Sequence, residues 1–135
     1  MLGEREMFEI RESLRDYADQ IMAKYPEFDV LRATTVSIVC QVSDRSKTKD
    51  GKRVYAETTK VPEKFKGIVN CDFIITFYVE PDDLALDKLE LLMYHELKHI
   101  GYNPTSGSCK IIPHDVEDFS DIIVKHGFNW IDDEE

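Results

Sequence analysis

The segment His95-Glu96-Leu97-Lys98-His99 constrains the fold of this chain more than any other feature of the sequence. Residues four positions apart lie on the same face of an α-helix, so a helix here lets both imidazoles reach one ion. Two neutral imidazoles suit zinc, and Glu96 projects close enough to take a proton from a water molecule on that ion. The pattern therefore predicts a helix with His95 and His99 as metal ligands and Glu96 as catalytic base.

A hydrogen-bonded pair of core histidines without a metal is the alternative interpretation of the same residues. Glu96 would then lie beside apolar helix residues without a cation, and an isolated buried carboxylate carries a large free-energy cost. Metal binding is therefore the favoured interpretation.

A catalytic zinc site usually has three protein ligands and one water molecule, so a third ligand is needed. His114 and His126 are the two remaining histidines. His114 follows a loop that could return to the metal, and we predict it as the third ligand. Glu117, one helical turn further on, is the substitute candidate. His126 is expected to be structural, near the end of the same helix, and Asp115 is expected to be a helix cap.

The strand signals predict an α+β fold with a small sheet of three to four strands. Alternating β-branched residues favour a strand over 33–42, and a more polar strand over 53–61 is expected to form a hairpin with it. The polar stretch between them contains Asp50-Gly51, a strong turn signal. The apolar run 73–79 is the clearest strand of the sequence.

Helical spacing predicts the elements that pack against this sheet. An N-terminal helix is expected over 4–25, where Pro26 ends the pattern. The helix that carries the two histidines is expected to begin at Pro81 and to stop at Gly101. A last helix is expected from Pro113 onward.

Composition and charge limit the class of protein. With 135 residues and 42% hydrophobic content, the chain fits one domain over 1–135. No apolar run is long enough to span a membrane, and 1–15 lacks the apolar stretch of a secretory signal. Three scattered cysteines predict neither a disulfide framework nor a paired-cysteine metal site, so a reducing cytoplasm is the expected location.

The formal net charge of −10 disfavours a nucleic-acid partner, because like charges repel a phosphate backbone. Despite the acidic net charge, a cluster of basic residues lies between Arg45 and Lys66. It is interpreted as a solvated hairpin turn.

Four blocks of the sequence resemble the phage metallopeptidases, small zincin-like domains found in phage genomes and prophages. The similar blocks are Asp72 with 73–79, the helical stretch 93–100, the stretch 114–119 (His-Asp-Val-Glu-Asp-Phe) and the stretch 127–130. The resemblance extends from about Asp29 to Trp130 and names no substrate. The long metzincin motif is not matched, because Thr105 stands where that motif has its third histidine.

This resemblance implies a specific metal site and fold. It implies His95, His99 and His114 as zinc ligands and Glu96 as the catalytic base. It also implies a small sheet packed beside the active-site helix.

The function expected from these observations is that of a cytoplasmic zinc metalloendopeptidase acting on a protein or peptide substrate. An extended substrate is expected to pair with an edge strand, either 73–79 or 53–61. Tyr94 and Tyr102 could stabilise an oxyanion, but packing is the commoner role of such tyrosines.

Two other functions remain open. One is a catalytically silent, metal-binding regulatory or peptide-binding protein. The other is a zinc-dependent endoribonuclease, which ranks lower because such sites lack the central glutamate and because the acidic charge opposes RNA binding.

Overall fold

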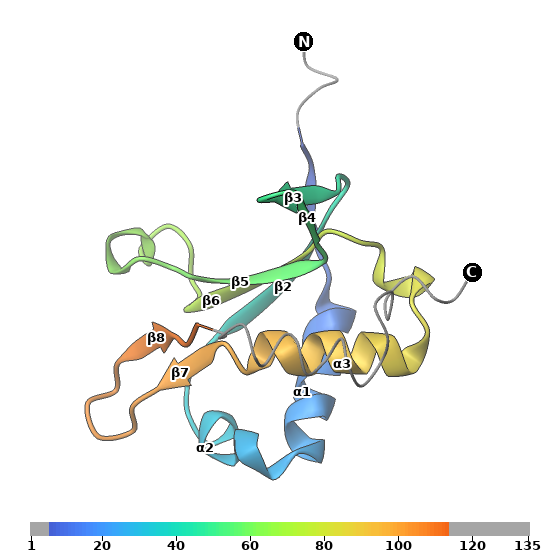
Figure 1. The fold of residues 1–135 in the computed structure, drawn as a ribbon. Helices are drawn as coiled ribbons and strands as arrows, with labels where there is room; N and C mark the ends of the chain where they lie inside the picture. Colours follow the sequence, from blue (N-terminus) through green and yellow to red (C-terminus); the bar gives the residue numbers. More distant parts are fainter. Residues whose placement is uncertain (1–5, 114–135) are drawn as a thin grey trace.

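The computed structural model describes residues 6–113 of the chain (Figure 1). Its main element is a four-stranded sheet in which the two central strands are parallel and both outer strands pair antiparallel. From one edge to the other, the strands are β1 (Phe8–Ile10), β2 (Ile38–Ser43), β6 (Phe73–Phe77) and β5 (Ala56–Lys60). The predicted α+β class with a small sheet is confirmed.

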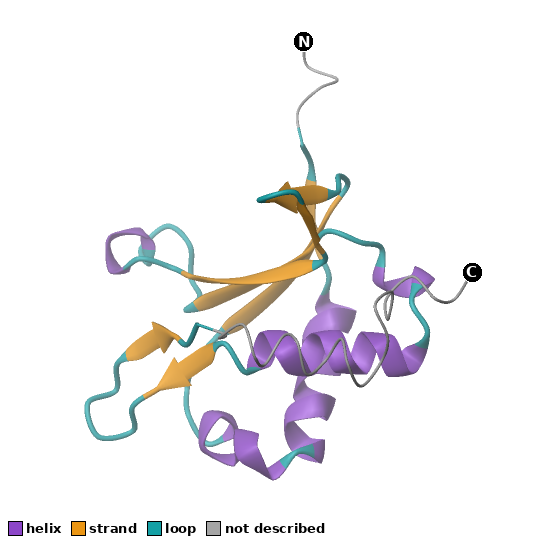
Figure 2. Ribbon diagram, in the orientation of Figure 1, coloured by secondary structure: helices purple, strands orange, loops and turns teal. Residues whose placement is uncertain are grey.

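Two helices pack on the same side of this sheet, as Figures 1 and 2 show. The helix α1 (Glu12–Lys24) contacts β2, and α3 (Leu86–Leu97) contacts both α1 and β5. Four short helical segments connect the main elements: η2 (Pro26–Phe28), α2 (Asp29–Arg32), η3 (Glu63–Phe65) and η4 (Pro81–Asp83).

The hydrophobic core lies between the sheet and the two helices. Phe73, Ile75 and Phe77 alternate along β6 and are completely buried, as expected for the face of a central strand that is covered by helices. Met93 and Leu97 of α3 are also completely buried against this layer. The core therefore fixes one face of α3 against the sheet.

The predicted hairpin between 33–42 and 53–61 is wrong. β5 pairs with β6, from Ala56↔Phe77 to Lys60↔Phe73, and β2 pairs in parallel with the other side of β6. The Asp50-Gly51 turn does form, with positive φ of 53° and 78° at its two residues. It closes a separate hairpin of β3 (Lys47–Lys49) and β4 (Lys52–Val54), consistent with the predicted solvated turn.

The prediction of 73–79 as an edge strand is also wrong. β6 lies between β2 and β5, so its main-chain groups are paired on both sides. The alternative segment 53–61 contains β5, which lies at one edge of the sheet as described, opposite β1.

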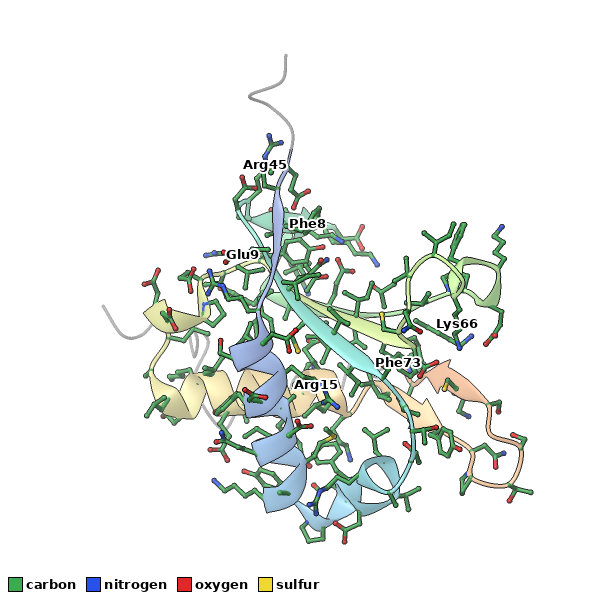
Figure 3. All side chains as sticks on the ribbon, turned by 180° about the vertical axis from the view of Figure 1, so that it is seen from behind. Phe8, Glu9, Arg15, Arg45, Lys66 and Phe73 are labelled. Atoms are coloured by element: carbon green, nitrogen blue, oxygen red, sulfur yellow. The ribbon has the colours of Figure 1, made fainter. Side chains whose placement is uncertain are left out.

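The N-terminal helix begins later than predicted. Residues 8–10 form β1, which pairs with β2, and α1 begins at Glu12 and ends at Lys24, just before Pro26. Phe8 (Figure 3) is 48% exposed and Met7 is 61% exposed, so the apolar residues that suggested a longer helix are not part of a buried helical face. Pairing with β2 overrides the local helical spacing.

The helix that carries the histidines is shorter than predicted at both ends. Pro81 begins η4, an extended residue at Leu84 interrupts the helical path, and α3 starts at Leu86. Gly101 does not end the helix but lies in β7 (Ile100–Tyr102), which pairs with β8 (Cys109–Ile111). The last predicted helix, beyond Pro113, lies outside the described residues.

All three cysteines are free thiols, and Cys40 and Cys71 are buried. Within the described range 6–113, no helix has the length and apolar character needed to cross a membrane.

Candidate metal centre

The end of α3 brings together the three side chains singled out by the sequence. One ligand atom each from His95, Glu96 and His99 lies within 4.8 Å of the others. His95 and Glu96 belong to the last turn of α3, and His99 follows its C-cap residue Lys98. The His99 amide donates to the Glu96 carbonyl at 3.1 Å, which keeps His99 close to the helical path. Helical spacing therefore produces the predicted grouping even though α3 itself ends at Leu97.

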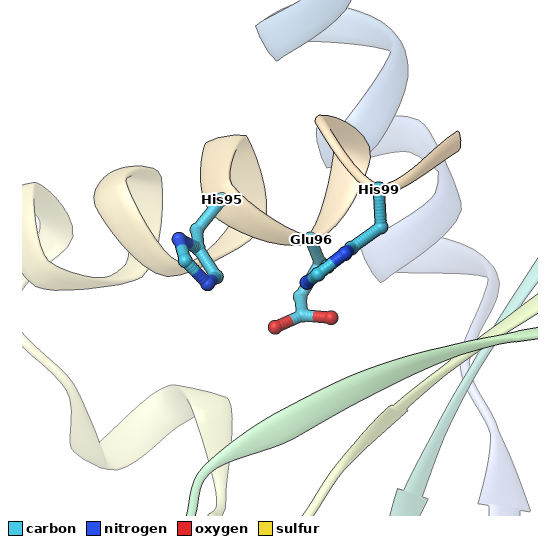
Figure 4. A group of neighbouring side chains, drawn as sticks. All are labelled: His95, Glu96 and His99. Carbon is cyan, nitrogen blue, oxygen red and sulfur yellow. The ribbon is translucent and has the colours of Figure 1, made fainter. Parts of the chain in front are cut away.

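These side chains project toward the sheet edge. Figure 4 shows both imidazole rings and the Glu96 carboxylate on the side of α3 that faces β5. The two ring centroids are 5.4 Å apart, and the ring planes are nearly perpendicular. The rings are half-buried, whereas Glu96 is only 3% exposed. Solvent can therefore reach the centre from the side of the two histidines, whereas the Glu96 carboxylate is enclosed by the protein.

The Glu96 carboxylate is held by the edge strand. Thr58 of β5 donates its hydroxyl to Oε1 at 2.9 Å and lies 3.0 Å from the Glu96 main-chain oxygen. Burial raises the pKa of Glu96 to about 7, the Thr58 hydrogen bond opposes this rise, and the negative charge of Glu57 adds to it. A carboxyl group that exchanges its proton near neutral pH is suited to general acid–base chemistry.

The His99 ring is oriented by a main-chain carbonyl. Its Nδ1 lies 2.7 Å from the oxygen of Ile112. A carbonyl oxygen can only accept, so Nδ1 carries the hydrogen and Nε2 keeps its lone pair. Burial lowers the pKa of His99, while the Ile112 carbonyl opposes the change. A neutral ring whose Nδ1 donates to a carbonyl oxygen, with the lone pair on Nε2, is the usual form of a metal-ligating histidine.

The β7–β8 hairpin carries Ile112 back to this histidine. Besides accepting from the ring, Ile112 donates its amide to the His99 main-chain oxygen at 2.7 Å. Two hydrogen bonds therefore connect the residue after β8 to the end of the helical segment. Pro113, the next residue, is the last that the structure describes.

The two candidate oxyanion tyrosines lie in different surroundings. The Tyr94 hydroxyl donates to Glu27, and its ring makes edge contacts with Tyr25 and Phe28 at centroid distances of 4.8 and 5.4 Å. Tyr94 thus packs where α3 meets α1, as the commoner role predicts. Tyr102 is half-buried in β7.

The candidate third ligand His114 lies outside the described residues. So do its substitute Glu117, the predicted cap Asp115 and His126. The described part of the centre comprises two imidazoles and one carboxylate.

Sequence reasoning missed two residues that contact the centre. Thr58 lies in a polar strand of ordinary composition, and Ile112 contributes only its main chain, which no side-chain motif reveals. The placement of 53–61 as a possible edge strand was the one signal that pointed toward Thr58.

Comparison with characterised proteins and with solved structures gave no significant match. A family model described as "Putative phage metallopeptidase" matches residues 6–134. The match includes the whole described centre and nearly the full length of the chain. The chain therefore belongs to the Putative phage metallopeptidase family.

Proposed function

We propose that this chain is a zinc-dependent metalloendopeptidase that hydrolyses peptide bonds, and that 1–135 form one zincin-like domain. The observation that carries the proposal is the convergence of His95, Glu96 and His99 within 4.8 Å beside the sheet edge. The family assignment supports peptidase activity and a metal. The free thiols of all three cysteines support a reducing, cytoplasmic location.

The donor set fits zinc. His95 and His99 offer imidazole nitrogens, and the hydrogen bond from Nδ1 of His99 to Ile112 puts the lone pair of that ring on Nε2, the atom that would hold the metal. When bound, zinc supplies Lewis acidity that polarises the scissile carbonyl and lowers the pKa of a water molecule at the site. Nitrogen ligands favour zinc over hard cations such as calcium or magnesium.

His114 is the proposed third ligand, with Glu117 as its substitute. Ile112 is bonded to His99 through both of its main-chain groups, and His114 follows two residues later. The chain therefore returns to the centre immediately before this residue.

Glu96 is the proposed general base. Its carboxylate takes a proton from the water molecule whose oxygen attacks the scissile carbonyl carbon. It then passes that proton to the nitrogen of the departing amine as the carbon–nitrogen bond breaks. Burial of Glu96 supports this role, because an enclosed carboxylate has less solvent to compete for the proton.

The proposed substrate is an extended segment of protein or peptide. Among the strands described for 6–113, β5 is an outer strand of the main sheet and pairs with β6 alone, so its outer main-chain groups can pair with an added strand. The same strand contacts α3 beside the metal centre. A peptide paired there would pass close to Glu96.

A zinc-dependent cleavage assay tests this function. The purified full chain, loaded with zinc, is incubated with a peptide library, and new termini are identified by mass spectrometry. We expect cleavage that a chelator abolishes and added zinc restores. Peptide binding without cleavage would favour the silent regulatory protein, and cleavage of RNA in a parallel reaction would favour the endoribonuclease.

Gly101 offers a test of the link between Ile112 and the metal centre. A Cβ at this position would lie 2.9 Å from Ile112 Cγ1 and 3.0 Å from Lys110 Cγ. Gly101→Ala should therefore displace Ile112 and loosen the orientation of His99. We expect a loss of about 1–3 kcal/mol in the free energy of unfolding. Zinc affinity should fall by about tenfold or more, as for other losses of a ligand's hydrogen-bond partner.

Urea unfolding and competition with a zinc chelator measure the two effects. Gly67→Ala is the matched control, because within 6–113 no atom beyond Gly67 and its two chain neighbours lies within 4 Å of the added Cβ. Unchanged zinc affinity in Gly101→Ala would show that Ile112 does not orient a zinc ligand.

A further inference from the structure

We propose that Thr58 is a positioning residue that fixes the general base for attack. Its hydroxyl holds Oε1 of Glu96, which leaves Oε2 to take the proton from the attacking water. This inference rests on the proposed peptidase function and assigns to the edge strand a second role besides pairing with the substrate.

The register of the sheet directs Thr58 toward α3. Thr58 stands directly opposite the completely buried Ile75, and opposed residues of an antiparallel pair share a face. The preceding residue, Glu57, points to the other face, where it accepts from Lys47 and from the Tyr78 hydroxyl at 2.5 Å. Strand alternation thus places Thr58 on the helix side of the sheet.

Thr58 contacts both the side chain and the main chain of Glu96. The Thr58 oxygen lies 2.9 Å from Oε1 and 3.0 Å from the main-chain oxygen of Glu96. A hydroxyl has a single hydrogen, which is shared between these two acceptors. One side chain of β5 therefore fixes the carboxylate and the main chain that carries it.

This restraint matters because a glutamate side chain rotates about several bonds. A general base must lie within hydrogen-bond reach of the proton that it removes, and a displacement of about 1 Å can lower a rate by about 100-fold. Both acceptors of the Thr58 hydroxyl belong to Glu96, which is not one of the proposed zinc ligands. Loss of this hydroxyl should therefore affect the chemical step and leave zinc binding in place.

The central variant is Thr58→Val, which keeps the shape of the side chain and removes the hydroxyl. We expect kcat per folded molecule to fall by about 10–100-fold, with KM and zinc affinity within about twofold of wild type. Thr58→Ser restores the donor and should recover most of kcat. Thr48→Val, at an exposed position of the separate β3–β4 hairpin, is the matched control and should retain full activity.

A purely structural role predicts a different result. Thr58→Val would then lower the free energy of unfolding while kcat per folded molecule stays unchanged, and this outcome overturns the proposal. Thr58→Ala provides a second variant without the hydroxyl, should valine prevent folding.

Crystal structures of the metal-free proteins separate this proposal from the proposed function. In Thr58→Val the Glu96 carboxylate should leave its wild-type position, and in Thr58→Ser it should remain. An unmoved carboxylate in Thr58→Val overturns the positioning role even if the wild type is a peptidase. A displaced carboxylate together with an inactive wild type would contradict the peptidase function alone.

Discussion

Glu96→Gln is expected to lower the rate of hydrolysis by orders of magnitude while the protein keeps its fold and its zinc. The substitution preserves the shape of the side chain, and the amide oxygen can still accept from the Thr58 hydroxyl. An amide cannot take and return a proton as a carboxylate does. Because general-base catalysis contributes about 10²–10⁴-fold, kcat should fall by that amount.

The fold should tolerate this change well. Glu96 is only 3% exposed, and a neutral amide removes the cost of burying a charge. Urea unfolding should therefore give a free energy of unfolding at least equal to that of the metal-free wild type. Metal analysis after dialysis should give an unchanged zinc content, because the proposed ligands are the flanking histidines.

Glu90→Gln is the matched control on the same helix. Glu90 accepts from Lys24 at 2.7 Å and from the Tyr25 hydroxyl at 2.5 Å, on the side of α3 that meets α1. This variant should retain its activity per folded molecule. Equal cleavage by Glu96→Gln and wild type would show that Glu96 is not the base.

The same pair of proteins can identify the substrate. Cells that express wild type or Glu96→Gln are compared for new protein termini by mass spectrometry. Termini that appear only with the wild type mark cleaved proteins, since both versions should share the same interactions and zinc content.

The sequence predicted those parts of the site that depend on local geometry. The grouping of His95, Glu96 and His99 follows from the rise and period of a single helical segment. The turn at Asp50-Gly51 forms for the same reason, because both residues tolerate positive φ. Neither feature requires knowledge of the remaining chain.

Pairings between distant segments could not be predicted in the same way. Met7 and Phe8 fit the helical spacing of the apolar residues that follow, yet 8–10 pair with β2 and form β1. The strand β5 follows β2 in sequence but pairs with the later β6. The contact of Thr58 with Glu96 spans 38 positions and exists only because of that pairing.

His114→Ala is expected to produce the largest loss of zinc affinity outside the helical motif. Removing one of three protein ligands should weaken binding more than the 10–100-fold cost of losing a ligand's hydrogen-bond partner, so we expect Kd to rise by more than about 100-fold. Dialysis followed by metal analysis should leave the variant with little zinc. The bonds between Ile112 and His99 do not involve His114, so the described fold should persist.

His126→Ala and Glu117→Ala complete this test. His126 is the matched control, because the same substitution at a histidine expected to be structural should leave zinc affinity unchanged. Wild-type affinity in His114→Ala combined with zinc loss in Glu117→Ala would assign the third ligand to the carboxylate. A third imidazole gives a centre with the full charge of the dication, whereas a carboxylate would neutralise part of that charge. The outcome therefore determines how strongly the centre can acidify the water that Glu96 deprotonates.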